Sequence, residues 1–265
     1  MHSDLFRLSD ALRERGIRCT ILSTGLLLGR RAPSVVRSLD DVIVSLDGPP
    51  QAHDLIRGIR GAFDCLSTGV RAVQSRHPRF PIAARCTVQR ANFPYLRETV
   101  RTAKQLGLQS ISFLAADLTS EAFNRTAGWS DERQAQVALT EEETLRLEDE
   151  IERLIEELPE HGEFVRETPE KLRRLGRHFK AHLGLAEPVA PRCNAPWVSA
   201  VVESDGTVRP CFFHKPIGNI KDRSLREVLN GPQAIEFRSR LDVSGDTTCK
   251  RCVCSLYLQP PASGL

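Results

Sequence analysis

Residues 41–46 read DVIVSL, a short apolar run rich in β-branched residues that predicts a strand covered on both faces. Runs of the same character occur at residues 17–23 (IRCTILS), 81–89 (PIAARCTVQ) and 110–115 (SISFLA). Amphipathic segments that predict helices lie before or between them, at residues 4–15, 63–77 and 95–106. Because parallel strands need a crossover connection, which a helix usually supplies, the alternation predicts an α/β fold with a parallel sheet. A doubly wound sheet and a partial barrel fit this pattern equally well.

A helical extension follows the predicted sheet. Residues 141–158 predict a long acidic helix that ends at a break over residues 159–162. Residues 169–183 predict a second, basic helix, whose charges we interpret as a solvated face. The segment EPVAP at residues 187–191 predicts an extended linker, because the residue before a proline disfavours helix. We therefore predict two domains, residues 1–186 and residues 187–265.

Composition narrows the class of protein. Hydrophobic residues make up 40% of the 265 residues, enough for a packed core. The net charge of +3 gives no indication of a nucleic-acid partner, which usually shows as a concentrated basic face. No run of eighteen apolar residues or secretory signal is found, so we expect no membrane span and a cytoplasmic location with reduced thiols.

The eight cysteines are unevenly distributed. Cys19, Cys65 and Cys86 stand alone in apolar or amphipathic segments, and we interpret them as ordinary buried thiols. The other five crowd into the last quarter of the chain, where they would need a metal or redox role. These are Cys193, Cys211, Cys249, Cys252 and Cys254.

Local signals in the last quarter predict how four of these sulfurs meet. Asp205-Gly206 predicts a hairpin turn between strands at residues 198–203 and 207–210, and SLRE at residues 224–227 is a capping box that starts a helix. The hairpin brings one pair of sulfurs together and the turn CKRC at residues 249–252 a second pair. Four thiolates suffice for a tetrahedral zinc ion or a cubane iron–sulfur cluster, and we favour one cluster. Its predicted ligands are Cys193, Cys211, Cys249 and Cys252.

Two neighbouring side chains have less certain roles. Cys254 is a fifth thiol, either a spare or an alternative ligand. His214 lies three residues past Cys211, and a single loop histidine is more often hydrogen-bonded than a metal ligand.

The same residues resemble a known module. Cys193, followed by GTVRPC (206–211), IGNI (217–220), SLREVLN (224–230) and CKRC (249–252), resembles the auxiliary-cluster module of radical S-adenosylmethionine enzymes. That module is termed SPASM in its long form, with two [4Fe–4S] clusters, and twitch in its short form, with one. The resemblance implies the one-cluster form here, because only Cys254 remains after the four ligands.

The upstream region resembles the barrel of the same enzymes. IVSLDGPP (43–50) and STG (23–25) are similar to the ends of its fourth and third strands. In the family these strand ends line the S-adenosylmethionine pocket, at the carboxyl edge of the parallel sheet. The resemblance implies that S-adenosylmethionine could be a cofactor. It also implies which side chains would face it: Ser23, Thr24, Ser45, Asp47 and Leu114.

The departures from the family are as informative as the matches. The printed sequence has neither the C-x-x-x-C-x-x-C motif that holds the radical-generating cluster nor the Gly-Gly-Glu motif that grips the cofactor's amine. We therefore expect a partial radical S-adenosylmethionine type (βα) barrel lacking its first strands, plus a small C-terminal hairpin and helix module for iron–sulfur.

Two functions follow as hypotheses. The first is a radical S-adenosylmethionine enzyme, an iron–sulfur oxidoreductase or modifying enzyme acting on a peptide or small metabolite, of which this chain is a truncated form. The second is a non-catalytic iron–sulfur or zinc-binding protein, acting with a partner chain that supplies the missing barrel segment.

Overall fold

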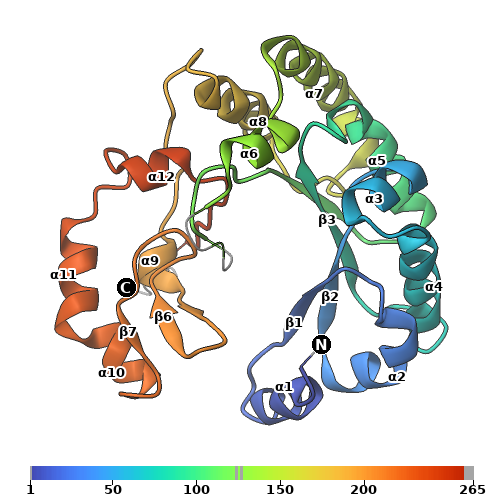
Figure 1. The fold of residues 1–265 in the computed structure, drawn as a ribbon. Helices are drawn as coiled ribbons and strands as arrows, with labels where there is room; N and C mark the ends of the chain where they lie inside the picture. Colours follow the sequence, from blue (N-terminus) through green and yellow to red (C-terminus); the bar gives the residue numbers. More distant parts are fainter. Residues whose placement is uncertain (1, 123–124, 126–127, 260–265) are drawn as a thin grey trace, which may run out of the picture. The chain divides into compact units, whose positions relative to one another are not determined.

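A computed structural model describes residues 2–122, 125 and 128–259 (Figure 1). The chain folds into two compact units. The first unit comprises Met1–Ala116 and Val137–Phe179, and the second comprises Asp117–Gln136 and Lys180–Leu265. The segment Asp117–Gln136, which interrupts the first unit in the sequence, therefore groups with the C-terminal residues.

A parallel four-stranded sheet forms the centre of the first unit. Its strands are β1 (Thr20–Ser23), β2 (Asp41–Ser45), β3 (Ile82–Val88) and β4 (Ile111–Ala115). They lie in the order β1-β2-β3-β4, and every pair is parallel. A doubly wound sheet reverses its strand order at a switch point, whereas a barrel keeps adding strands in one direction. The unreversed order therefore decides for the partial barrel. An isolated parallel bridge from Ile111 to Val165 continues the sheet beyond β4.

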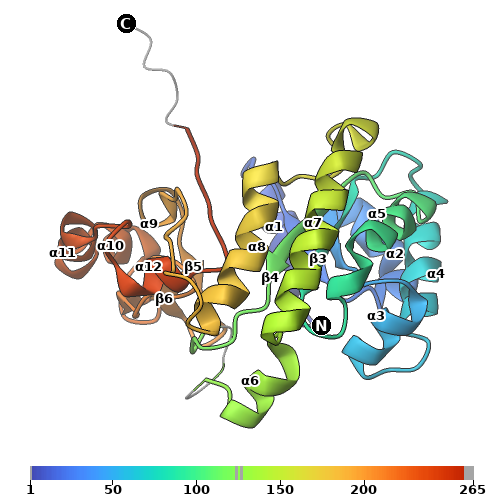
Figure 2. The same ribbon diagram turned by 90° about the horizontal axis from the view of Figure 1, so that it is seen from above.

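Helices follow the strands and cover one face of this sheet (Figure 2). The strand residues on that face, such as Val42, Val44 and Ile82, are fully buried. Residues on the opposite face, such as Ile43 and Ser45, are only half-buried. The helices are α1 (Leu5–Arg13), α2 (Leu28–Ser38), α3 (Pro50–Arg57), α4 (Ala62–Gln74), α5 (Leu96–Gln105), α7 (Glu141–His161) and most of α8 (Pro169–His182), with the short 3-10 helix η1 (Phe93–Tyr95).

Helices α2 and α4 pack at unusually short range, and glycines make this possible. A Cβ atom at Gly69 would lie 2.8 Å from the Leu28 Cβ and 3.1 Å from the Gly29 backbone nitrogen. Any side chain at Gly69 would therefore push the two backbones apart. Cys65, also on α4, is exposed, so the expectation that it is buried was wrong. It lies one residue off the buried stripe of Ala62, Leu66 and Val70.

Other sequence expectations for the helices had mixed outcomes. The apolar stripe of Leu147, Ile151 and Leu154 is buried as predicted, and a capping box at Thr140 and Glu143 starts α7. The expected break at Pro159 was wrong, because α7 continues to His161 and ends at Gly162. Helix α3 was not predicted, although Pro50 stands in its first turn, where proline is favoured.

The second unit is small and has little apolar core. A three-stranded antiparallel sheet joins β5 (Val201–Val202), β6 (Thr207–Arg209) and β7 (Gly218–Asn219). The strand predicted from residue 198 starts only at Val201, because Pro196 opens a helical turn there. The second unit also contains most of helix α6 (Asp131–Val137). Its other helices are α9 (Ala195–Val198), α10 (Leu225–Asn230), α11 (Pro232–Arg240) and α12 (Thr247–Arg251).

The hydrophobic core cluster of this small sheet consists of the buried residues Val208, Ile217, Val228 and Ala234. All eight cysteines are free thiols, so no disulfide stabilises this module. Modules with so small a core usually need a disulfide or a bound metal.

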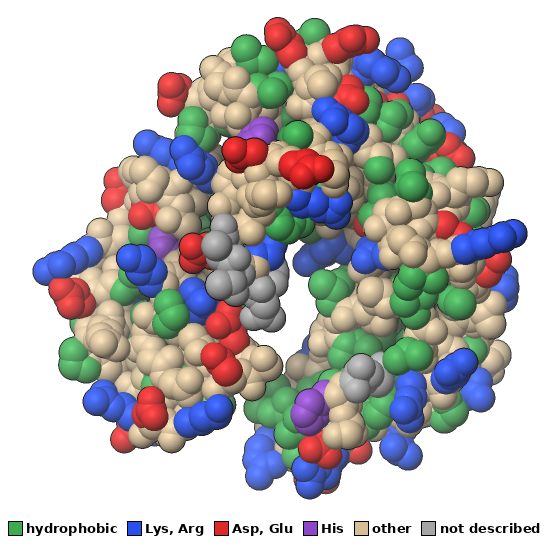
Figure 3. All heavy atoms as spheres, in the orientation of Figure 1, with side chains coloured by type: hydrophobic (Ala, Val, Ile, Leu, Met, Phe, Trp, Pro, Cys, Tyr) green, Lys and Arg blue, Asp and Glu red, His purple; other side chains and the backbone are tan. Residues whose placement is uncertain are grey.

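Charge is spread evenly on the face of the molecule drawn in Figure 3, where basic and acidic side chains intersperse. Within the described residues, no helix combines the length and the apolar character that crossing a membrane requires.

Candidate metal centre

The four predicted ligands all lie in the second unit, on turns next to its short elements. Cys193 precedes α9, and Cys211 follows β6 in the hairpin loop. Cys249 lies within α12, and Cys252 is the residue at its C-terminal end. The spacing of three within one helical turn places Cys249 and Cys252 on the same side of α12.

Three of the sulfurs influence one another electrostatically. Burial, then the Asp246 carboxylate and the charges of Cys211 and Cys193, together raise the pKa of Cys249 to about 12. Burial also raises the pKa of Cys211, while backbone N–H groups of Phe213 and His214 donate to its sulfur and oppose that rise. Such thiols hold their protons at neutral pH until a metal displaces them. Cys193, Cys211 and Cys249 therefore lie in one region of the module.

The fourth sulfur has a local contact. The Cys252 thiol donates to the backbone carbonyl of Cys254 at 2.7 Å. Cys254 therefore contacts the Cys252 sulfur through its backbone carbonyl.

Asp246 is a polar residue of the site that the sequence reasoning missed. Its carboxylate is the N-cap of α12 and accepts from the Cys249 backbone N–H at 2.8 Å. It thereby fixes the turn that presents Cys249. The signal was available, since aspartate three residues before a helical position is a common capping pattern.

His214 reaches the same cysteine from the hairpin loop. Its Nε2 lies 3.4 Å from the Cys249 Sγ and 3.9 Å from the Asp246 Oδ1. The imidazole is 8% exposed, and burial lowers its pKa. A hydrogen-bonded role was expected for it from the sequence, and the structure gives it this contact with the Cys249 sulfur.

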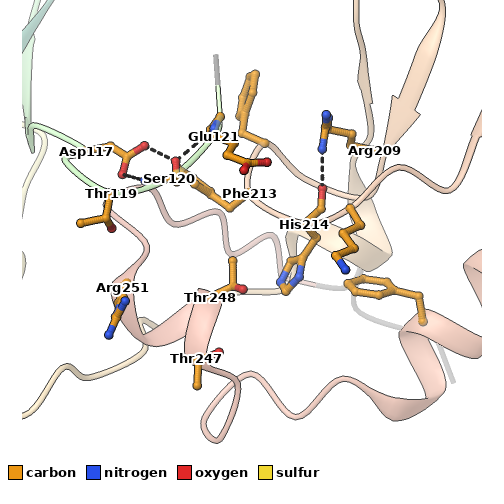
Figure 4. Close-up of a pocket in the computed structure, with 14 residues that line it drawn as sticks. Asp117, Thr119, Ser120, Glu121, Arg209, Phe213, His214, Thr247, Thr248 and Arg251 are labelled. Atoms are coloured by element: carbon orange, nitrogen blue, oxygen red, sulfur yellow. Dashed lines mark hydrogen bonds between the residues drawn. The ribbon is translucent and has the colours of Figure 1, made fainter. Parts of the chain in front are cut away.

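A cavity of about 490 Å³ opens beside these turns, within the second unit (Figure 4). Four of its lining residues directly follow Cys211, and Thr247 and Thr248 directly precede Cys249. The basic side chains on its wall are Arg209, Lys215 and Arg251, and the acidic ones are Asp117 and Glu121. Its volume is in the range of small-molecule sites. A ligand here would lie next to the metal centre.

The residues predicted for the cofactor pocket belong to the first unit, and the sheet register separates them. Ser45 is in register with Arg85 of β3, and Leu114 with Thr87. Both therefore lie on the half-buried face of the sheet. Ser23 is in register with the buried Val44, so it points to the helix-covered face, where its Oγ accepts from the Gly25 N–H at 3.1 Å. Thr24 is exposed just beyond β1.

Asp47 is 1% exposed and faces α3. Its carboxylate forms an ion pair with Arg57 at 2.5 Å, and its backbone N–H donates to His53 Nδ1 at 3.3 Å. Asn92, also buried, donates from Nδ2 to the carbonyls of Asp47 at 2.8 Å and Thr87 at 3.0 Å. These contacts hold the strand ends of β2 and β3 together.

Glu167 is a further titratable residue that no motif indicated. It follows the bridge at Val165, accepts a hydrogen bond from the Phe113 backbone N–H, and leaves its Oε2 buried without a hydrogen-bond partner. Burial raises the pKa of its carboxyl to about 7, although the nearby Arg85 charge opposes this. The protonated form is therefore favoured in the folded protein below about pH 7.

This shift predicts a pH-dependent stability. Because the folded pKa exceeds the unfolded one, Glu167 stabilises the fold at low pH, and the contribution is lost as the pH rises from about 4.5 through about 7. Ionisation of Glu167 should lower the unfolding free energy of the unsubstituted protein by up to about 3 kcal/mol between pH 5 and 8, and Glu167→Gln should abolish this decrease. Urea unfolding of both proteins across this range measures the difference. Parallel pH profiles for the two proteins would show that the carboxyl ionises normally.

Comparison with known proteins identifies the class first. Residues 193–253 match the sequence model of the SPASM family, an iron–sulfur cluster-binding domain. Iron–sulfur clusters are the groups that this family binds. The resemblance of these residues to the SPASM module, predicted from the sequence, is confirmed. The parallel α/β fold predicted for the chain is also found in the solved structures below.

The chain is similar to parts of three longer proteins. Fe-coproporphyrin III synthase of Methanosarcina barkeri (strain Fusaro / DSM 804) is 24% identical over 243 residues, which are 86% of this chain and 58% of that protein. Native anSMEcpe with bound AdoMet and a Cp18Cys peptide has a TM-score of 0.57 at 18% identity, covering 87% of this chain and 63% of that one. Streptococcus suis SuiB bound to S-adenosylmethionine has a TM-score of 0.57 at 14% identity, covering 96% and 59%. The chain spans less than two thirds of the length of each.

Proposed function

We propose that this chain carries one auxiliary [4Fe–4S] cluster, held by Cys193, Cys211, Cys249 and Cys252, in a protein that modifies a peptide or a small molecule. The observation that carries the proposal is the donor set. Thiolates are the ligands of iron–sulfur clusters, and the charges of three of these four act on one another. When bound, such a cluster supplies a one-electron redox centre.

The family match supports a cluster over a single zinc ion. Residues 193–253, which match an iron–sulfur cluster-binding domain, include all four cysteines. Four thiolates alone would also suit zinc, so the match is what favours the cluster.

The substrate class rests on the relatives. SuiB is described bound to the precursor peptide SuiA, and anSMEcpe bound to a peptide, whereas the synthase is named for Fe-coproporphyrin III. Both a peptide and a small molecule remain within the proposal, with the cavity beside the metal centre as the site. S-adenosylmethionine would bind along the half-buried face of the first unit's sheet, where Ser45 and Leu114 lie. The cytoplasm, where thiols stay reduced, is the compartment that we propose.

A second candidate is a non-catalytic iron–sulfur or zinc protein that works with a partner chain. The observation that favours it is β1, which pairs only with β2 among the described strands and exposes Leu22 to 61%. An open strand edge of this kind accepts a further strand. A partner chain that supplies a further strand would cover it.

Metal analysis tests the proposal. After anaerobic reconstitution with iron and sulfide, we expect a brown protein with about four irons and four sulfides per chain. Elemental analysis and absorption spectra of the same sample measure both. Stoichiometric zinc with no iron would refute the cluster and favour the second candidate.

A further inference from the structure

His214 is held rigidly on its loop. Arg209 donates from Nη1 to the His214 carbonyl at 3.1 Å, and the Arg209 Nε is itself anchored to Glu203 at 3.0 Å. The imidazole packs edge-on against the Phe237 ring, with 4.9 Å between centroids. The backbone of His214 is therefore held by Arg209 and its ring by Phe237, with Nε2 within 3.4 Å of the Cys249 sulfur.

The charges around Nε2 determine which atom carries the hydrogen. A cysteine bound to a cluster is a thiolate, which can only accept. The second group near Nε2 is the Asp246 carboxylate, 3.9 Å away and also an acceptor. Both neighbours therefore favour the hydrogen on Nε2, and the 3.4 Å contact becomes an N–H···S hydrogen bond once the cluster is present.

We propose that His214 donates this hydrogen bond to the Cys249 Sγ and thereby raises the reduction potential of the cluster. The inference rests on the proposed cluster. Reduction by an external low-potential donor adds one electron and one negative charge, and breaks no bond. Part of that charge resides on the cysteine sulfurs, so a donor aimed at one of them stabilises the reduced form more than the oxidised form. His214 is then a positioning residue for the electron-transfer step.

Redox titration of the reconstituted 265-residue chain, followed by electron paramagnetic resonance, measures the potential. His214→Leu removes the donor and keeps an apolar contact for Phe237, so the equilibrium constant for reduction should fall about tenfold, which corresponds to about 59 mV for one electron. His214→Gln, which retains an N–H donor, should recover most of that loss. His77→Gln, at an exposed histidine of the first unit, is the matched control and should leave the potential unchanged.

Iron content, measured on every sample, separates the outcomes. About four irons with an unshifted potential in His214→Leu would overturn this inference and leave the cluster intact. Loss of one iron in that variant would make His214 a ligand and overturn it too. Zinc in place of iron in the unsubstituted chain would remove the proposed function and this inference together.

Isotope labelling tests the same contact without any substitution. Pulsed electron paramagnetic resonance of the reduced cluster, in protein labelled with 15N-histidine, should show one weak nitrogen hyperfine coupling, as expected through a hydrogen bond. A strong coupling would indicate direct ligation, and no coupling would indicate no contact. Either result would overturn the proposal.

Discussion

Replacing Cys211 or Cys249 by alanine is expected to abolish the brown colour and to reduce bound iron from about four atoms per chain to almost none. Both sulfurs lie in the mutually interacting group, and in the proposed site each would supply the thiolate for one corner of the cluster. Removing one leaves an iron open to solvent on a module with a very small apolar core. Iron and sulfide analysis after parallel anaerobic reconstitution measures the loss.

Two further variants make this result specific. Cys65→Ala, at an exposed cysteine of α4, is the control and should retain full iron. Cys254→Ala should also retain it, whereas Cys252→Ala should not, if Cys252 is the fourth ligand. The reverse outcome for that pair would assign the ligand to Cys254. Full iron in Cys211→Ala or Cys249→Ala would contradict the proposed site.

The 265-residue chain is expected to yield no 5′-deoxyadenosine when incubated with S-adenosylmethionine and dithionite. Reductive cleavage of the sulfonium needs a cluster with an open iron, which the amine and carboxylate of the cofactor can chelate. A cluster held by four cysteines has no open iron, and the printed sequence contains no C-x-x-x-C-x-x-C motif to hold another. Chromatography of the quenched reaction detects the product.

The control for this experiment is the iron count of the same sample, which must show a loaded cluster. The result then reflects the ligand set and not a missing metal. Formation of 5′-deoxyadenosine in amounts that rise with protein concentration would overturn the prediction.

Much of the fold was predictable because its signals are local. The strand runs, the capping box at Ser224 and the grouping of the cysteines depend on residues near one another in the chain. The periodicity alone could not choose between a barrel and a doubly wound sheet, because strand order depends on pairing between distant segments, and only the family resemblance favoured the barrel. The grouping of Asp117–Gln136 with the C-terminal residues has the same cause.

The cofactor pocket proposed for the first unit was harder to predict, because it depends on the register between the strands. Side chains alternate between the faces of a strand, so the assignment of a residue to a face depends on its exact partner. The pairing of Ser23 with Val44 places Ser23 away from Ser45 and Leu114. Asp47 lies beyond its strand, where Arg57 binds the carboxylate. Neither the strand pairing of Ser23 nor the ion pair of Asp47 could be predicted from the residues next to it in the sequence.

The bridge made by Asn92 has a consequence for conformational entropy. Its Nδ2 donates to the carbonyl of Asp47, two residues beyond β2, and to the carbonyl of Thr87 near the end of β3, and its Oδ1 accepts from the Gln89 N–H at 2.8 Å. Moving either segment alone would leave a buried polar group without a partner, at a cost of about 1–3 kcal/mol. The two segments therefore fluctuate as one body. When a ligand orders either segment, the protein loses the conformational entropy of one unit rather than of two. More of the contact energy of the ligand is then left for affinity.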